Sequence, residues 1–214
     1  MLDGGRGRFV TSYPPPASQS GKPGLRPRYL VGAMIVTWFV GVQGLTMGLH
    51  DASYLRHGSS LVTDAATRSP REAAEVARLK ALGEMADIAF PLAAAQILLS
   101  GLLVVSSGLA MGGRRGARSL ALQAIGAHLA FAAVDYVLTQ RVRGAVFDAY
   151  ARAVAETTDL RDPLAFLGFW RERILFILFH GATMAVGAFA LTRERTKAFF
   201  AAVARATERA EEDS

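Results

Sequence analysis

Three ionisable side chains lie inside long apolar stretches of the chain, and their types and spacing suggest chemistry. His128 and Asp135 are seven residues apart in one stretch, and His180 lies near the middle of another. A seven-residue spacing places His128 and Asp135 on the same face of a helix. Ionisable groups are costly inside membrane spans and commonly mark functional sites there. These three residues are therefore the first candidates for function.

The two histidines are the candidate cofactor-binding residues. His128 lies nine residues after Ser119, about 14 Å along a helix, and His180 lies thirteen residues before Arg193, about 20 Å. On neighbouring antiparallel helices they could reach a similar depth. Two facing imidazoles form the axial ligand pair of a b-type haem in a helical bundle. The commoner alternative is a neutral histidine that bonds to a neighbouring helix, with no cofactor.

Asp135 has two interpretations. In the functional one, it joins His128 in a proton or cation path, as in a small coupled transporter. In the structural one, it lies about 7 Å below the outer end of its span. There it would pair with Arg141, Arg171 or Arg173. The structural interpretation is preferred, because charged partners are near in the sequence.

The remaining sequence shows no motif of a soluble enzyme. The chain has no Cys, which excludes disulfides, thiolate catalysis, iron–sulfur clusters and c-type haem. It has no glycine-rich phosphate loop, no H-E-x-x-H and no G-x-S-x-G. His50 and His57 flank Asp51, but a metal site there would need further ligands. We therefore expect no catalytic residue, no metal site and no enzymatic activity.

Four apolar windows position these residues, at about 29–49, 88–111, 120–139 and 174–192. Each has about the 20 residues that a helix needs to cross a ~30 Å hydrocarbon core. Mean hydropathy is +0.26 although 20% of the residues are charged, so the charges are segregated from the apolar windows. The sequence predicts an all-α polytopic membrane protein, with four transmembrane helices in a bundle and helical extensions on the outer side.

Charge outside the windows predicts the orientation. Segments 1–28, 112–119 and 193–214 carry net charges of +4, +3 and 0, whereas segments 50–87 and 140–173 together sum to zero. The positive-inside rule then places both termini in the cytoplasm, as in a multi-pass protein of a bacterial inner membrane. The predicted membrane topology explains the excess of basic residues, so the lipid bilayer is the expected partner and no nucleic acid is required.

The windows divide the chain into three regions. Residues 1–28 are rich in Gly, Pro, Ser and Arg and are expected to be a disordered cytoplasmic tail. Their charged leader is too long for a cleaved signal peptide, so the first window is interpreted as a retained span. Residues 29–193 form the predicted membrane domain. Residues 194–214 form a charged cytoplasmic tail, predicted to be a helix that continues from the fourth span.

Helix-forming patterns continue outside two of the windows. Ser69 and Pro70 have the N-cap and first-position pattern of a helix start. We expect one helix over 70–111, bent near Pro91. Apolar spacing likewise predicts that the third span continues outward without a break, over 119–156.

Small and amide side chains are expected to hold the spans together. Helices in lipid associate through close packing of small residues and through interhelical hydrogen bonds. The candidate packing residues are Gly41, Gly44, Gly48, Gly181 and Ala185, and the intramembrane polar residues besides Asp135 are Gln43, Gln96 and Gln123. If the chain dimerises, the GxxxG step of Gly44 and Gly48 is a candidate seam.

The pattern favours a non-enzymatic membrane subunit, scaffold or accessory protein, working as a homo-oligomer or in a larger membrane complex. One alternative is an electron-transfer protein with haem b on His128 and His180. The other is a small proton- or cation-coupled transporter that uses Asp135.

Overall fold

The structure is a computed structural model that describes residues 26–57, 70–157 and 163–212, with side chains 155–173 and 176 left undescribed. The described residues form only helices. They are α1 (Arg28–His57), α2 (Pro70–Glu84), α3 (Ala86–Gly112), α4 (Ala117–Leu138), α5 (Gln140–Thr157), α6 (Pro163–Thr192) and α7 (Glu194–Glu212). The all-α class is confirmed for this part of the chain. Residues 1–25 of the predicted disordered tail lie outside it.

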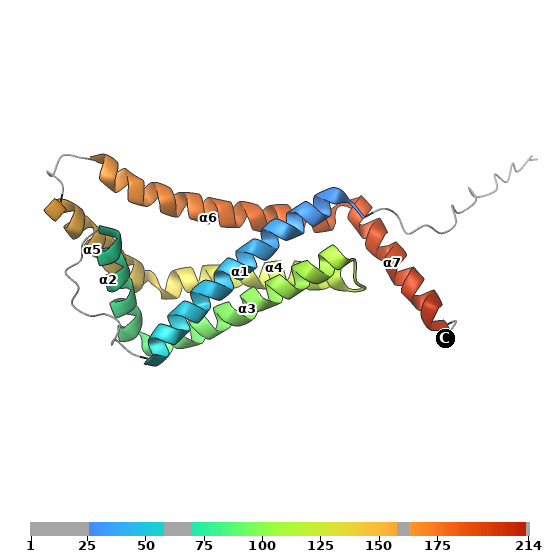
Figure 1. The fold of residues 1–214 in the computed structure, drawn as a ribbon, viewed down its shortest axis with the longest axis horizontal. Helices are drawn as coiled ribbons and strands as arrows, with labels where there is room; N and C mark the ends of the chain where they lie inside the picture. The colour runs from blue at the N-terminus through green and yellow to red at the C-terminus, as the bar shows by residue number, and fades with distance from the viewer. Residues whose placement is uncertain (1–25, 58–69, 158–162, 213–214) are drawn as a thin grey trace, which may run out of the picture.

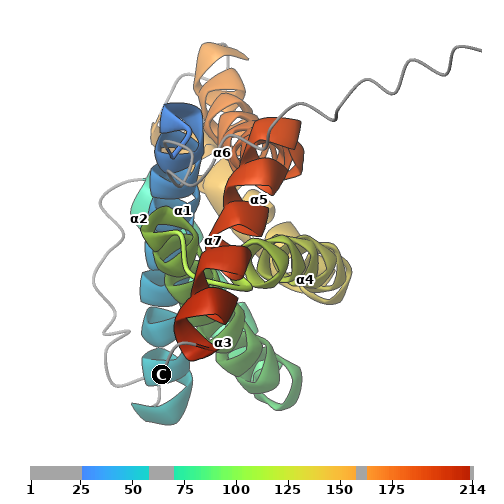
Figure 2. The ribbon, with the colours of Figure 1, turned by 90° about the vertical axis from the view of Figure 1, so that its right-hand side faces the viewer.

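Helices α1, α3, α4 and α6, the longest in the described part of the chain, run lengthwise through the molecule (Figure 1). Helix α1 packs against α3 and α6, and α4 packs against the same two helices. Helices α2 and α5 pack on each other at one end of the molecule. Helix α7 crosses in front of the long helices when they are viewed from the other end (Figure 2).

Helices α1, α3 and α4 are long and apolar enough to cross a membrane, and α6 is apolar over Ile177–Thr192. Their surfaces are rich in large apolar side chains. Phe39 on α1 is 61% exposed, and Leu98 on α3 is 73% exposed. Soluble monomers rarely expose apolar patches beyond a few hundred Å². The surface of these helices is therefore of the kind that faces lipid.

Gly41, Gly44 and Gly48 of α1 lie against α3. A Cβ atom on Gly41 would lie 2.9 Å from Val104 Cγ2, and one on Gly48 would lie 2.9 Å from Ile97 Cγ1. On Gly44 it would lie 2.5 Å from Ser100 Oγ. These glycines are thus covered by α3 of the same chain, which leaves Gly44 and Gly48 unable to serve as a seam between two chains.

The packed face of α6 differs from the one that the sequence indicated. Gly181 and Ala185 are exposed, and no atom lies within 4 Å of a Cβ built on Gly181. Instead Met184 and Leu191 are buried, and a Cβ on Gly187 would lie 2.6 Å from Thr37 Oγ1 of α1. The face of α6 that packs against the other helices therefore carries Met184, Gly187 and Leu191.

The predicted single helix over 70–111 is divided at Met85, so the expectation of one helix bent near Pro91 is wrong. Pro91 lies inside α3 without ending it. The break follows Gly83, which favours helix poorly. It lets α2 turn onto α5, where Leu82 and Val142 belong to one apolar cluster. Tertiary packing, rather than the proline, thus determines where this helix ends.

The predicted continuous helix over 119–156 is divided as well, at Thr139. Backbone hydrogen bonds cross the break, from Thr139 N to Asp135 O and from Arg143 N to Thr139 O. The expected extension exists, but as a separate helix that packs on α2. The local pattern predicted its helical state and missed the bend.

The C-terminal tail is also a separate helix, because the chain bends at Arg193 between α6 and α7. Thr196 Oγ1 donates to the carbonyl of Ala190 at 2.8 Å and lies 3.0 Å from the hydroxyl of Tyr29. These contacts hold α7 against the ends of α6 and α1.

Candidate functional site

The structure brings His128 of α4 and His180 of α6 together. Their Nε2 atoms lie 3.1 Å apart, their ring centroids 5.1 Å apart, and the ring planes differ by 28°. The His128 side chain is almost fully buried, and His180 is half-buried. Residues 52 positions apart in the chain therefore meet between two helices.

The rings approach through their Nε2 edges, because the ring centroids are farther apart than the two nitrogens. The Nε2 atoms are at hydrogen-bond distance, as in an N–H···N bond between imidazoles of different tautomers. Nδ1 of His128 is buried without a hydrogen-bond partner among the described residues.

The direction of the pair suits axial metal ligation, but its spacing does not. Two metal–nitrogen bonds of about 2.0 Å on opposite sides of one ion would separate the nitrogens by about 4 Å. The observed 3.1 Å is about 1 Å too short. The pair as it stands fits a shared hydrogen bond, and haem iron would fit only after α4 and α6 had separated.

Asp135 lies two turns outward from His128 and is half-buried. Sequence proximity suggested Arg141, Arg171 or Arg173 as its partner. Among the described residues, the cation that acts electrostatically on it is Arg143. The spacing 135–139–143 repeats every four residues, which aligns side chains along one helix face. That repeat is the sequence signal that could have indicated Arg143.

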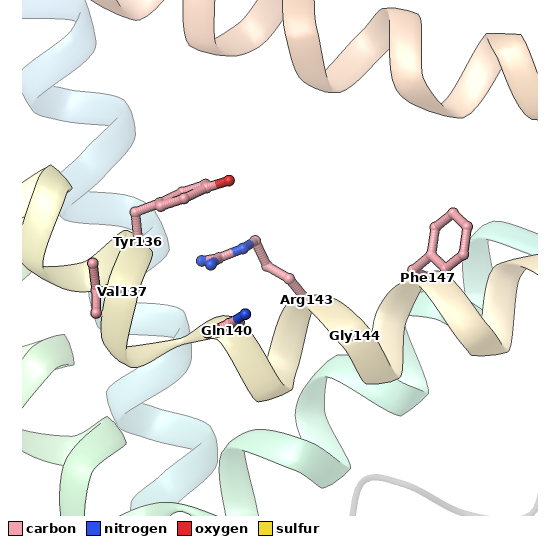
Figure 3. Close-up of a pocket in the computed structure, with 6 residues that line it drawn as sticks. All are labelled: Tyr136, Val137, Gln140, Arg143, Gly144 and Phe147. Atoms are coloured by element: carbon pink, nitrogen blue, oxygen red, sulfur yellow. The ribbon is translucent and has the colours of Figure 1, made fainter.

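Arg143 is held over the ring of Tyr136, with the guanidinium carbon 3.8 Å from the ring centroid. Its Nη1 also donates to Thr139 Oγ1 at 3.0 Å. These residues lie at an open cavity of about 550 Å³ at the α4–α5 junction. In Figure 3, the side chains of Tyr136, Arg143 and Phe147 project on the side of α4 and α5 that faces α6.

The three intramembrane glutamines have different surroundings. Gln96 donates from Nε2 to Ser100 Oγ at 3.3 Å and lies against Gly44. Gln43 and Gln123 are exposed on α1 and α4. Within this chain, only Gln96 lies at an interface between two helices.

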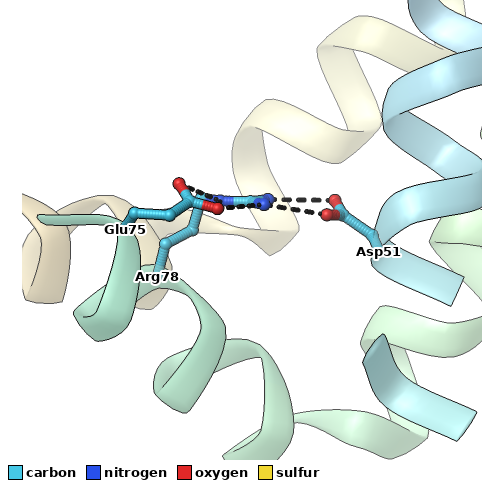
Figure 4. A network of polar contacts seen from close by, with 3 residues as sticks. All are labelled: Asp51, Glu75 and Arg78. Atoms are coloured by element: carbon cyan, nitrogen blue, oxygen red, sulfur yellow. Dashed lines mark hydrogen bonds and ion pairs between the residues drawn. The ribbon is translucent and has the colours of Figure 1, made fainter. Parts of the chain in front are cut away.

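A second polar cluster, which the sequence analysis missed, joins α1 to α2 (Figure 4). The Arg78 guanidinium lies between Asp51 and Glu75, with Nη2 2.9 Å from Asp51 Oδ1 and 2.8 Å from Glu75 Oε1. The hydrogen bond from Arg78 lowers the pKa of the Glu75 carboxyl, against the opposing effect of burial. The same carboxylates raise the pKa of Arg78, although burial alone would lower it.

The remaining histidines are not part of these clusters. His57 bonds through Nδ1 to the carbonyl of Ser53, and His50 acts electrostatically on Glu75. Among the described residues, no group of three His, Asp or Glu side chains is arranged to hold a metal ion.

Comparisons with protein families, with curated proteins and with solved structures gave no match.

Proposed function

We propose that the chain is a four-span integral membrane protein with both termini in the cytoplasm, working as a non-enzymatic subunit or accessory protein. The observation that carries the proposal is the exposed apolar surface of the long helices. Three of them have the length and composition of spans, and α6 adds an apolar segment that packs between α1 and α4. Charge supports the orientation, because Arg114, Arg115 and Arg118 lie at the short α3–α4 turn.

The subunit role is supported by the placement of Gln43. This amide is exposed on α1, within the first apolar window, and would face lipid in an isolated chain. A polar group in hydrocarbon is costly without a hydrogen-bond partner. A second copy or another membrane protein would supply that partner.

The topology can be tested in the native sequence background, because the chain has no Cys. Single cysteines replace exposed residues: Glu84→Cys and Asp148→Cys on the outer helices, Arg114→Cys at the α3–α4 turn and Glu212→Cys on α7. An impermeant maleimide is added to intact spheroplasts or to lysed ones. We expect the first two positions to react in both and the last two only after lysis.

Glu212→Cys separates four spans from three. If α6 does not cross the membrane, this position reacts in intact spheroplasts while Arg114→Cys stays protected. Labelling of Arg114→Cys without lysis would instead reverse the proposed orientation.

The second candidate function is electron transfer by haem b, favoured by the approach of His128 and His180 through their Nε2 edges. Bound haem would supply a one-electron couple, and the two imidazoles would hold it. This requires α4 and α6 to separate by about 1 Å at this level, since iron does not fit the present spacing.

An absorption spectrum tests this candidate. Protein expressed with ample haem is purified in detergent and measured oxidised and dithionite-reduced. Haem ligation predicts a Soret band that is lost in His180→Ala and retained in His57→Ala, the matched exposed histidine. A flat wild-type spectrum would contradict haem binding and leave the pair as an interhelical hydrogen bond.

A further inference from the structure

The cavity at the α4–α5 junction lies where the third apolar helix ends. We call it the Arg143 cavity. It is lined by Tyr136, Val137, Gln140, Arg143, Gly144 and Phe147. Helix α4 ends at Leu138, so the lining begins at the end of the apolar segment and continues into the polar helix α5. In the proposed topology this is the level of the outer lipid headgroups.

Arg143 gives the cavity a positive charge. One of its nitrogens donates to Thr139, and its guanidinium stacks on Tyr136. No described carboxylate lies within ion-pair distance of it, although Asp135, two turns earlier on the same face, acts on it electrostatically. A guanidinium has five N–H donors, so donors remain for a ligand in the cavity. Stacking on one face fixes its plane, which favours bidentate binding of a phosphate.

The surroundings of the cavity are apolar on the membrane side. Val134 and Val137 of α4 are exposed, as is Leu138. Leu175 and Leu178 on the outer half of α6 are also exposed. Hydrocarbon chains could lie along this surface while a charged group occupies the cavity. Tyr136 has the amphipathic ring that is typical of the headgroup region.

We propose that the Arg143 cavity binds the phosphate of a glycerophospholipid from the outer leaflet, with its acyl chains along α4. Charge complementarity assigns the phosphate to Arg143, and Gln140 provides a further polar group for the headgroup. A lipid fits better than a soluble anion, because Val137 of the cavity lining belongs to an exposed apolar stretch of α4 that includes Val134 and Leu138. This inference rests on the proposed membrane topology.

Native mass spectrometry of the full chain in detergent tests the proposal. Three probes are compared: phosphatidylglycerol, diacylglycerol with the same acyl chains, and glycerol 3-phosphate. We expect phosphatidylglycerol to remain bound, diacylglycerol to bind about tenfold more weakly because it lacks the charged hydrogen bonds, and glycerol 3-phosphate to compete poorly.

Two variants test the residues independently. Arg143→Gln removes the charge and is expected to weaken phosphatidylglycerol binding about tenfold. The matched control is Arg141→Gln, an exposed arginine two residues away that does not line the cavity. Gly144→Leu fills the cavity while keeping the charge, since a Cβ there meets no atom within 4 Å. It is expected to weaken binding with the helix intact.

Each alternative has its own outcome. Equal binding of diacylglycerol would show an apolar groove and overturn the role of Arg143. Strong competition by glycerol 3-phosphate would show a soluble-anion site and overturn the lipid assignment. Equal losses in Arg143→Gln and Arg141→Gln would show diffuse surface charge. If the cysteine-labelling pattern is as expected but the chain retains no phosphatidylglycerol, this inference fails and the proposed topology stands.

Discussion

Individual polar side chains in the long helices mostly bond within their own helix. Thr37 and Thr46 each donate to the carbonyl four residues earlier, and Ser106 donates to Leu103. Such bonds satisfy hydroxyls in an apolar setting without a partner helix. The bond between His128 and His180 instead joins two helices. Interhelical bonds of this kind contribute on average about 0.6 kcal/mol in membranes, so the pair favours a specific arrangement more than it stabilises the fold.

Arg78 provides the first prediction, at the same residue scale. It is the common partner of Asp51 on α1 and Glu75 on α2, and its side chain is 22% exposed. Arg78→Gln should lower the free energy of local opening of α2 by about 1–2 kcal/mol. Hydrogen exchange of the α2 amides measures this. Lys80→Gln, an exposed control on the same helix, should leave exchange unchanged.

The same contact predicts a pH dependence. The pKa of Glu75 lies below its ordinary value of 4.5 because Arg78 bonds to the ionised carboxylate. Its stabilising contribution is therefore complete above pH 4.5 and is lost as the pH falls through the lowered pKa. The groups around Glu75 include Asp51 and His50 of α1. Protection of α2 that was lost already near pH 6, above the ordinary pKa of Glu75, would contradict this assignment.

At the scale of elements, the contact between α1 and α3 depends on the absence of side chains. Gly41 faces backbone atoms of α3, with Ser100 O and Val104 N each 3.2 Å from the position of its Cβ. The backbone atoms of α3 shift less easily than the end of a flexible side chain to make room for an added side chain. Gly41→Val should therefore destabilise the protein by about 1–3 kcal/mol through overpacking.

The matched control is Gly32→Val, because Gly32 lies on the same helix with no atom within 4 Å of its Cβ position. Denaturant-induced unfolding of the detergent-solubilised chain gives both values. Equal losses would mean that helix propensity, rather than the α1–α3 contact, causes the effect.

The sequence predicted the long helices because apolar windows reflect a local property, composition over about 20 residues. It could not predict the ends of α2 and α4. Met85 and Thr139 mark bends that let α2 meet α5, a contact between segments about 70 residues apart that no local pattern encodes.

The candidate site was likewise predictable from the sequence only in part. Counting helix rise allowed His128 and His180 to reach a similar depth. Their separation of 3.1 Å depends on the approach of α4 and α6, which helix rise does not determine. Two of the arginines expected to pair with Asp135, Arg171 and Arg173, have side chains outside the described residues. Among the described residues Arg143 acts electrostatically on Asp135, and the four-residue repeat along the helix leads to it.

At the scale of the whole molecule, the described residues contain two apolar clusters. The larger is built from α1, α3, α4 and α6, with Phe200 of α7. The smaller lies between α2 and α5 at the opposite end and includes Leu82 and Val146. The Asp51–Arg78–Glu75 network and the bends at Met85 and Thr139 connect the two. We therefore predict that α2 and α5 open while the long helices remain packed.

Val146→Ser tests this division. Val146 is 3% exposed, and the change removes a buried methyl group and places a hydroxyl in an apolar cluster. The expected cost is about 1–3 kcal/mol. Hydrogen exchange should accelerate in α2 and α5 and stay unchanged in the α1–α3 contact, with Asp148→Ser as the exposed control on the same helix. If exchange instead accelerates equally in all helices, the two clusters unfold as one unit. The outer pair would then have to be a cooperative part of the membrane fold, because loss of its packing would be transmitted through α3 and α4.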